Sequence, residues 1–130
     1  MSDLLSQLEG LIALVESGQT LEALERYYAV DVLVRENRQL SRAGRAQCLE
    51  FERQQLAQQQ RPARIQCLRK GVDPASDCSF IEWKIRTLAP DGHVMLLEEV
   101  AVQTWQQGQI TEERFYYSGA VDEGPAEGEF

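Results

Sequence analysis

The stretch Tyr27–Asn37, YYAVDVLVREN, marks the point at which the sequence changes from a helical to an extended pattern. Upstream of it, apolar residues lie at helical spacing behind Thr20, a good helix N-cap. Within it, residues 31–36 alternate and are rich in β-branched side chains, which is typical of a short strand. The stretch therefore predicts a helix that leads directly into a strand, and the strand ends in a carboxylate, Glu36.

Two further helices are predicted on either side of this junction. The first spans residues 2–17, where apolar side chains recur at helical spacing, with Ser2 as N-cap and Gly18 as the stop. The second spans about residues 42–59 and is closed by Pro62, because a proline cannot continue a helix. Residues 37–41 are predicted to be a polar connection between strand and helix.

From Arg61 onward the sequence has the pattern of strands and turns. Turn residues follow at Pro90–Gly92 and Gln106–Gly108, which predicts hairpins there. The acidic segment 120–130 contains Gly and Pro and is expected to be disordered, so one domain is predicted over residues 1–119. The predicted strands cover residues 63–68, 80–88, 93–105 and 109–118.

Helices followed by a run of antiparallel strands predict an α+β fold. The expected architecture is a cone-shaped, curved antiparallel sheet with three N-terminal helices packed on its concave face. Such a sheet leaves a conical cavity beneath the helices, and ligand pockets form in concave places of this kind.

Composition excludes several classes of function. The chain has 130 residues and a formal net charge of -8, whereas a nucleic-acid surface needs clustered Lys and Arg. No apolar run is long enough to span a membrane and no signal peptide is apparent, so we expect no membrane partner. The odd count of three cysteines predicts reduced thiols in a cytoplasmic protein, and a single histidine argues against a metal site.

Two stretches of the sequence resemble the SnoaL-like branch of the nuclear transport factor 2-like, or ketosteroid isomerase-like, superfamily. Residues 27–37 resemble its helix-to-strand junction, and Ser41–Ala46 follows where the family has a Gly-rich start to the third helix. Residues 100–117, with Trp105 and the run ERFYY at 113–117, resemble its final hairpin. The resemblance implies the fold and a small-molecule pocket, but the family includes isomerases, dehydratases, cyclases, hydrolases and binding modules.

Ketosteroid isomerase, in the same superfamily, implies a role for one carboxylate. Its general base follows the first strand, and counting from the Tyr28–Ala29 junction places Glu36 at that position. Its two oxyanion donors fall near Leu11 and Ala101, so both are missing here. Glu36 is therefore the candidate catalytic base, and the alternative is a strand-end acid paired with a nearby arginine.

The long strand over residues 93–105 carries polar residues on the face that includes Ala101. If the isomerase register holds, Glu99 and Gln103 point into the cavity, which is costly unless they bind something or each other. The alternative is a register shifted by one residue, which turns them toward solvent or a partner chain.

Aromatic side chains complete the predicted substrate-binding set. Tyr28 and Tyr117 can offer hydroxyls to a ligand carbonyl, although buried tyrosines also bond to nearby backbone groups. Trp83, Trp105 and Phe115 are expected in the core or the pocket wall rather than as platforms for a cofactor.

The residues leave two main hypotheses for function. The first is an enzyme of the isomerase, cyclase or dehydratase type that acts on a hydrophobic carbonyl compound, with no cofactor. The second is a non-catalytic, dimeric module that binds a ligand or another protein. A third hypothesis is an accessory part of a larger assembly, in which the acidic tail would be an interaction arm. The resemblance implies a homodimer through the outer sheet face, where four residues of the long strand are apolar: Val94, Leu96, Val100 and Val102.

Overall fold

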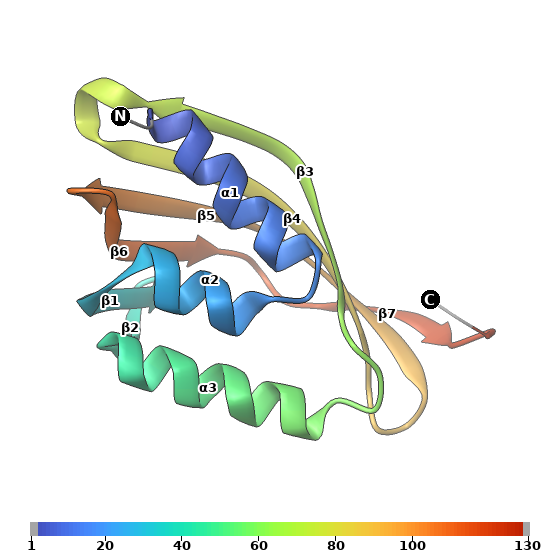
Figure 1. Cartoon of the computed structure of the whole chain (residues 1–130). Coiled ribbons are helices and arrows are strands. Elements are labelled where there is room, and N and C mark those ends of the chain that lie inside the picture. The colour runs from blue at the N-terminus through green and yellow to red at the C-terminus, as the bar shows by residue number, and fades with distance from the viewer. Residues whose placement is uncertain (1–2, 129–130) are drawn as a thin grey trace.

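The computed structural model describes residues 3–128 as three helices and a seven-stranded sheet, with one short 3₁₀ turn at Pro74–Ser76. Helices α1 and α2 precede the first two strands, and α3 lies between strands β2 and β3 (Figure 1). The helices are α1 (Leu4–Glu16), α2 (Thr20–Tyr27) and α3 (Arg45–Gln58). The strands are β1 (Tyr28–Glu36), β2 (Gln39–Ala43), β3 (Arg64–Asp73), β4 (Cys78–Leu88), β5 (His93–Gln106), β6 (Gln109–Tyr116) and β7 (Val121–Pro125).

The helix ends differ in detail from the predicted ones. Asp3 caps α1, because its carboxylate accepts a hydrogen bond from the Ser6 N–H at 2.7 Å; the predicted cap, Ser2, lies outside the described residues. Gly18 ends this segment as predicted, with a φ of 83° that favours glycine. Gln19, rather than Thr20, occupies the N-cap position of α2.

The sheet is curved and open, and its strand order is β2-β1-β6-β5-β4-β3. All pairs, including β5 with β7, are antiparallel except β1 and β6, which run parallel. All three helices lie over one face (Figure 1). The predicted α+β class with helices on the concave face is therefore confirmed.

Two segments depart from the sequence-based expectation. Residues 37–41, predicted to be a connection, instead belong to a hairpin in which β2 pairs with β1. Residues Val121–Pro125, expected in a disordered tail, form β7 along the first half of β5. Side chains hold β7 there, because His93 contacts Asp122 at 2.9 Å and Arg86 contacts Glu123 at 2.8 Å.

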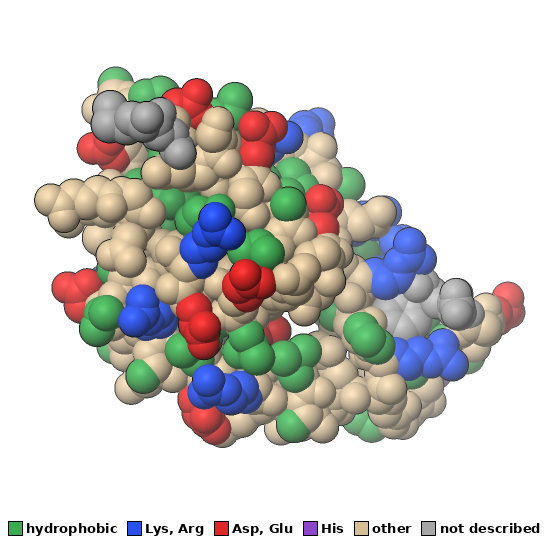
Figure 2. Space-filling view, viewed as in Figure 1, with side chains coloured by type: hydrophobic (Ala, Val, Ile, Leu, Met, Phe, Trp, Pro, Cys, Tyr) green, Lys and Arg blue, Asp and Glu red, His purple; other side chains and the backbone are tan. Residues whose placement is uncertain are grey.

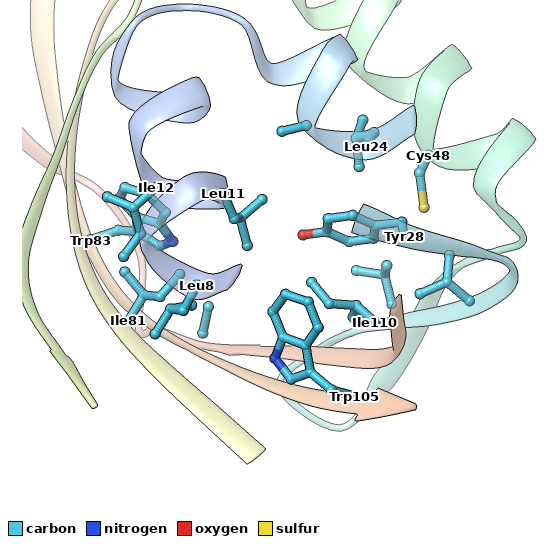
Figure 3. Packing of buried hydrophobic residues seen from close by; sticks show 14 residues of the cluster. Leu8, Leu11, Ile12, Leu24, Tyr28, Cys48, Ile81, Trp83, Trp105 and Ile110 are labelled. Carbon is cyan, nitrogen blue, oxygen red and sulfur yellow. The ribbon is translucent and has the colours of Figure 1, made fainter. Parts of the chain in front are cut away.

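The core lies between α1, α2 and the middle of the sheet. Leu8 and Leu11 of α1 pack against Ile81, Trp105 and Ile110 of the strands (Figure 3). The Tyr28 ring enters this cluster from β1, with its hydroxyl pointing inward (Figure 3). Burying such side chains contributes roughly 1.5–3 kcal/mol each, which fixes the helices on the sheet.

Strand register places a row of polar side chains among the apolar ones on the concave face. Ser79 of β4, Gln103 of β5, Glu113 of β6 and Val34 of β1 lie side by side across four strands. Paired residues share one face of a sheet, so the three polar groups face the helices. Glu99, four residues before Gln103 on β5 and on the same face, lies opposite Trp83.

Candidate functional site

A cavity of about 330 Å³ lies between α2, α3 and the concave face of the sheet. Its walls are largely apolar, with Leu24, Val34, Ile85, Leu97 and Phe115 among the lining residues. Figure 2 shows an opening between the helices and the long strands, bordered by hydrophobic side chains with acidic ones beside it. This volume lies at the lower end of the range of small-molecule pockets.

A smaller compartment of about 170 Å³ extends the cavity toward the core. It shares Tyr28, Glu99, Glu113 and Phe115 with the main cavity. Its far end is apolar, because Leu11 and Trp83 close it. A ligand that fills both parts therefore needs an apolar end directed toward α1.

The charged lining of the main cavity is dominated by carboxyl groups. Glu36, Glu52, Glu99 and Glu113 line it, while Arg42 is the one Lys or Arg among the described lining residues. The Arg42 guanidinium contacts Glu36 at 3.2 Å and lies 4.1 Å from the centre of the Phe51 ring. One cation beside four carboxyl groups does not neutralise the site if all four are ionised.

Glu36 lies at the rim and is held in its ionised form. Its carboxylate accepts hydrogen bonds from Tyr117 Oη at 2.6 Å and Ser41 Oγ at 2.7 Å, in addition to the Arg42 contact. Burial acts to raise the pKa of Glu36, but these hydrogen bonds and the charge of Arg42 outweigh burial and lower it. Glu36 is therefore a charged group at neutral pH, anchored on both oxygens.

Glu99 has the opposite environment. Burial is the main cause that raises the pKa of Glu99 to about 7; the neighbouring Glu113 and Glu36 act in the same direction, and the charge of Arg42 acts against it. Within residues 3–128 its carboxyl group has no hydrogen-bond partner, and Glu99 lines both parts of the cavity. Glu99 thus gains and loses a proton near neutral pH, next to the ionised Glu36.

Behind the wall, five side chains form a buried hydrogen-bonded chain. Trp105 Nε1 donates to Ser79 Oγ at 2.8 Å, and Ser79 Oγ donates to Gln103 Oε1 at 2.7 Å. Gln103 Nε2 donates to Glu113 Oε2 at 2.7 Å, and the other Glu113 oxygen contacts the Tyr28 hydroxyl. The chain ends at the cavity, because Glu113 and Tyr28 both line it.

Two further titratable groups line the cavity from α3. Burial raises the pKa of Glu52, although the charge of Arg42 opposes this. Burial also raises the pKa of the Cys48 thiol, so Cys48 is a neutral, buried side chain rather than a reactive thiolate.

The predicted site residues occupy three different positions. Tyr28, Glu99 and Phe115 line the main cavity with Glu36, and Trp83 lines the inner compartment. Gln103 and Trp105 lie behind the wall, where Gln103 is fully buried. Tyr117 lies at the rim, bonded to Glu36.

The positions that correspond to the isomerase donors are apolar in the structure. Leu11 is buried and lines the inner compartment, and Ala101 is buried in the sheet. Neither can donate a hydrogen bond through its side chain, so any donor to a ligand must come from elsewhere in the cavity.

Sequence reasoning missed two groups of this site. Glu113 was noted only as part of the resemblance, although it lies two residues before Phe115 on the same strand and so shares its face. Arg42 was expected at the start of the third helix, whereas the unpredicted strand β2 carries it to the cavity. The alternation of Glu113 with Phe115 was the available signal; nothing in the sequence indicated β2.

The described residues offer no evident metal site and no helix that could cross a membrane. In residues 3–128, no three or more His, Cys, Asp or Glu side chains come together in an arrangement that could hold a metal ion. The helices of this part of the chain are also too short or too polar for a membrane span.

Solved structures of other proteins have the same fold. A Mesorhizobium loti protein assigned as a SnoaL-like polyketide cyclase is 22% identical over 89% of this chain and 100% of its own, with a TM-score of 0.68. An NTF2-like protein of unknown function from Burkholderia pseudomallei is 13% identical over 91% and 92% of the two chains, with a TM-score of 0.74.

A third similar structure is an LEH-like epoxide hydrolase from M. tuberculosis, 14% identical over 88% of this chain and 82% of its own, with a TM-score of 0.70. No family model matches the sequence, and no curated protein matches it. At these identities the similarity establishes the SnoaL-like, NTF2-like fold, and the chemistry must be argued from the residues of the cavity.

Proposed function

We propose that this chain, which has the SnoaL-like, NTF2-like fold, binds a small, mostly apolar carbonyl compound in its cavity and moves protons on it with its own side chains. The reaction would be of the isomerase, cyclase or dehydratase type, and each of these begins by removing a proton next to a carbonyl group. Similar folds include a protein assigned as a polyketide cyclase and an epoxide hydrolase, which supports small-molecule chemistry in this cavity.

The proposal rests on two carboxyl groups of opposite character, Glu36 and Glu99, which line the same cavity. Glu99 has a pKa of about 7, so both of its protonation states are populated at neutral pH. Glu36 has a lowered pKa and stays ionised. A site with one ionised and one protonated carboxyl group can hold a base and an acid at the same time.

The two carboxyl groups divide the reaction between them. Glu36 accepts the proton from the carbon next to the carbonyl group, the electron pair of that C–H bond forms a C=C bond, and the π electron pair of the carbonyl group moves onto its oxygen. Protonated Glu99 donates to this oxygen and becomes ionised. In an unsaturated ketone, Glu36 returns its proton to a different carbon while Glu99 regains its proton from the enol oxygen, which completes an isomerisation. In a cyclisation, the carbon attacks a second carbonyl group, the π bond of that group breaks, its oxygen takes the proton from Glu36, and Glu99 regains its proton from the enol oxygen.

The apolar walls define the rest of the substrate. Leu24, Val34, Ile85 and Leu97 offer no polar partner, so burying apolar ligand surface supplies most of the binding free energy. The Phe115 ring adds an apolar surface beside the carboxyl groups. The volume of about 330 Å³ favours a molecule of one or two rings over a long chain.

The experiment is a screen for proton exchange in deuterated water. Apolar ketones are incubated with the protein, and deuterium incorporated next to the carbonyl group is measured by mass spectrometry. We expect exchange above the buffer rate with at least one ketone, and losses of about 100-fold in Glu36→Gln and Glu99→Gln. Glu98→Gln is the matched control, because Glu98 is exposed on the opposite face of the same strand. No exchange above buffer with any ketone, or equal exchange in Glu98→Gln and Glu99→Gln, would contradict the proposal.

We further propose that the outer sheet face forms a homodimer, whether the cavity is catalytic or only binds a ligand. Val100 and Tyr116 are paired on this face and are 40% and 47% exposed, and the nearby Phe80 is 39% exposed. A contiguous apolar patch on a sheet favours association with a second copy. Sedimentation velocity should show a dimer that Val100→Asp dissociates. A wild-type monomer at high protein concentration would refute this assembly.

A further inference from the structure

The buried chain from Trp105 to Tyr28 has one feature that determines the direction of its hydrogen bonds. The indole N–H of Trp105 can only donate. It donates to Ser79 Oγ at 2.8 Å, so the hydroxyl hydrogen of Ser79 must point elsewhere. The Ser79 hydroxyl therefore donates to its other partner, Gln103 Oε1 at 2.7 Å, because an amide oxygen can only accept. Gln103 is therefore oriented with its carbonyl toward Ser79 and its amide nitrogen toward Glu113.

This orientation distinguishes the two oxygens of Glu113. Gln103 Nε2 lies 2.7 Å from Glu113 Oε2 and donates to it, so Oε2 carries no proton on that side. The other oxygen, Oε1, faces the Tyr28 hydroxyl. A proton held by Glu113 therefore resides on Oε1, between the carboxyl group and Tyr28.

The surroundings of Glu113 favour the neutral carboxyl group. Glu113 is 3% exposed, and within residues 3–128 no Lys, Arg or His side chain forms an ion pair with it. A buried carboxylate without a cation partner is costly, and a protonated one is not. Burial accordingly raises the pKa of Glu113, although hydrogen bonds from Gln103 and Tyr28 and the charge of Arg42 act against it.

We propose that Glu113 is held protonated and donates its proton to the phenolic oxygen of Tyr28, which turns the hydroxyl hydrogen of Tyr28 into the cavity. Tyr28 is then a hydrogen-bond donor to an acceptor oxygen of the ligand, such as a carbonyl. Trp105, Ser79, Gln103 and Glu113 are positioning residues that act through Tyr28. This inference rests on the proposed function only in taking the cavity as the ligand site.

The chemistry of Tyr28 fits this role. Burial raises the pKa of Tyr28 well above its usual value, so the phenol keeps its hydrogen at neutral pH. Leu11 of α1 and Ala101 of β5 supply no side-chain donor, whereas Tyr28 supplies one from β1. As negative charge develops on a carbonyl oxygen, a fixed donor in a dry cavity becomes more favourable, which lowers the barrier.

The first test needs no ligand. Infrared spectra compare the Glu99→Gln protein with the Glu99→Gln/Glu113→Gln protein, because the first substitution removes the carboxyl group of Glu99, whose pKa is about 7. We expect a protonated-carboxyl C=O band at neutral pH that disappears in the double variant. A difference spectrum without that band would overturn the proposal. Carbon-13 NMR of wild-type protein labelled at glutamate carboxyl carbons gives the same answer without any substitution.

The second test uses acetophenone as the probe and reads its carbonyl stretch by infrared spectroscopy. A donor shifts this band to lower frequency. Glutamine at position 113 must turn its oxygen toward Gln103 and its NH₂ toward Tyr28, so it reproduces the protonated carboxyl group. We expect the same shifted band in wild type, Glu113→Gln and the matched control Glu112→Gln, and a clearly smaller shift in Tyr28→Phe, where Glu99 is the remaining donor. An unchanged shift in Tyr28→Phe would overturn the donor role of Tyr28.

The outcomes of the second test separate the alternatives. A shifted band that appears only in Glu113→Gln would mean that ionised Glu113 takes the Tyr28 hydrogen in the wild type, and this overturns the proposal. The absence of a shifted band from every protein would overturn the donor role of Tyr28. Deuterium exchange by Glu36 and Glu99 is measured separately, so it can succeed or fail independently of either result.

Discussion

Gln103 and Glu113 lie directly opposite each other on β5 and β6, and the Gln103 amide donates to the Glu113 carboxyl group at 2.7 Å. Both side chains are almost completely buried. A sheet that was only a scaffold would have apolar residues here, because burying two polar groups yields little net stability even when they are well paired. Their presence next to the cavity indicates that the polar chain serves the site.

Breaking this pair should destabilise the protein. Gln103→Leu removes one buried hydrogen-bond partner from Ser79 and one from Glu113, so we expect a loss of about 2 kcal/mol in the free energy of unfolding, measured with urea. Gln106→Leu, an exposed position on the same strand, is the control and should change it by less than about 0.5 kcal/mol. Equal stabilities of the two variants would show that the network contributes nothing to the fold.

The raised pKa of Glu99 makes stability depend on pH. The folded protein binds this proton up to about pH 7, whereas the unfolded chain releases it near the ordinary value of 4.5. Since the folded state binds more protons in that window, stability falls as pH rises from 4.5 to 7, by about 3 kcal/mol from this group alone. Glu99→Gln should remove that part of the decline, as measured by urea unfolding across the window. A pH profile of Glu99→Gln that matched the Glu98→Gln profile would be inconsistent with this role.

The rim hydrogen bond from Tyr117 should control the charge of Glu36. Tyr117→Phe removes a donor to Glu36 Oε1, so the pKa of Glu36 should rise, as measured by carbon-13 NMR. The acidic limb of the exchange profile should then move to higher pH. Tyr116→Phe is the control, since Tyr116 is exposed on the outer face. An unchanged Glu36 titration in Tyr117→Phe would remove Tyr117 from the site.

Attachment of β7 should weaken as His93 loses its proton. The hydrogen bond with Asp122 raises the pKa of His93, so the ion pair contributes fully below the ordinary value of 6.5 and is lost as pH rises through the higher folded value. Hydrogen-exchange protection factors of residues 121–125 should therefore decrease over that range. In Asp122→Asn this pH dependence should be absent, and a wild-type strand with constant protection would argue against the contact.

Local patterns were sufficient for most of the fold. Apolar spacing in α1 and alternation along β4, β5 and β6 determined those elements, because helix and strand periodicity reflect which face is buried. Strand β7 was missed because its pairing depends on distant partners, His93 and Arg86, and its own composition resembles that of a flexible tail.

The site residues were predictable only where polar and apolar side chains alternate clearly along a strand. Glu99 and Gln103 stand among apolar neighbours on a long strand, so their inward direction could be anticipated. Glu113 lies in the charged run Glu112–Arg114, which resembles an exposed surface, and Arg42 depends on a hairpin that its sequence does not signal. Roles that arise from tertiary contacts, such as the neutral form of Glu113, have no local signal at all.

Proton transfer in the cavity is tested most directly by the rate at which the protein exchanges deuterium into the methyl group of acetophenone near neutral pH. The rate is compared among wild type, Glu99→Gln and Glu98→Gln. Proton transfer in the cavity predicts exchange above the buffer rate for wild type and Glu98→Gln and a loss of about 100-fold in Glu99→Gln. Equal rates in all three proteins would contradict it.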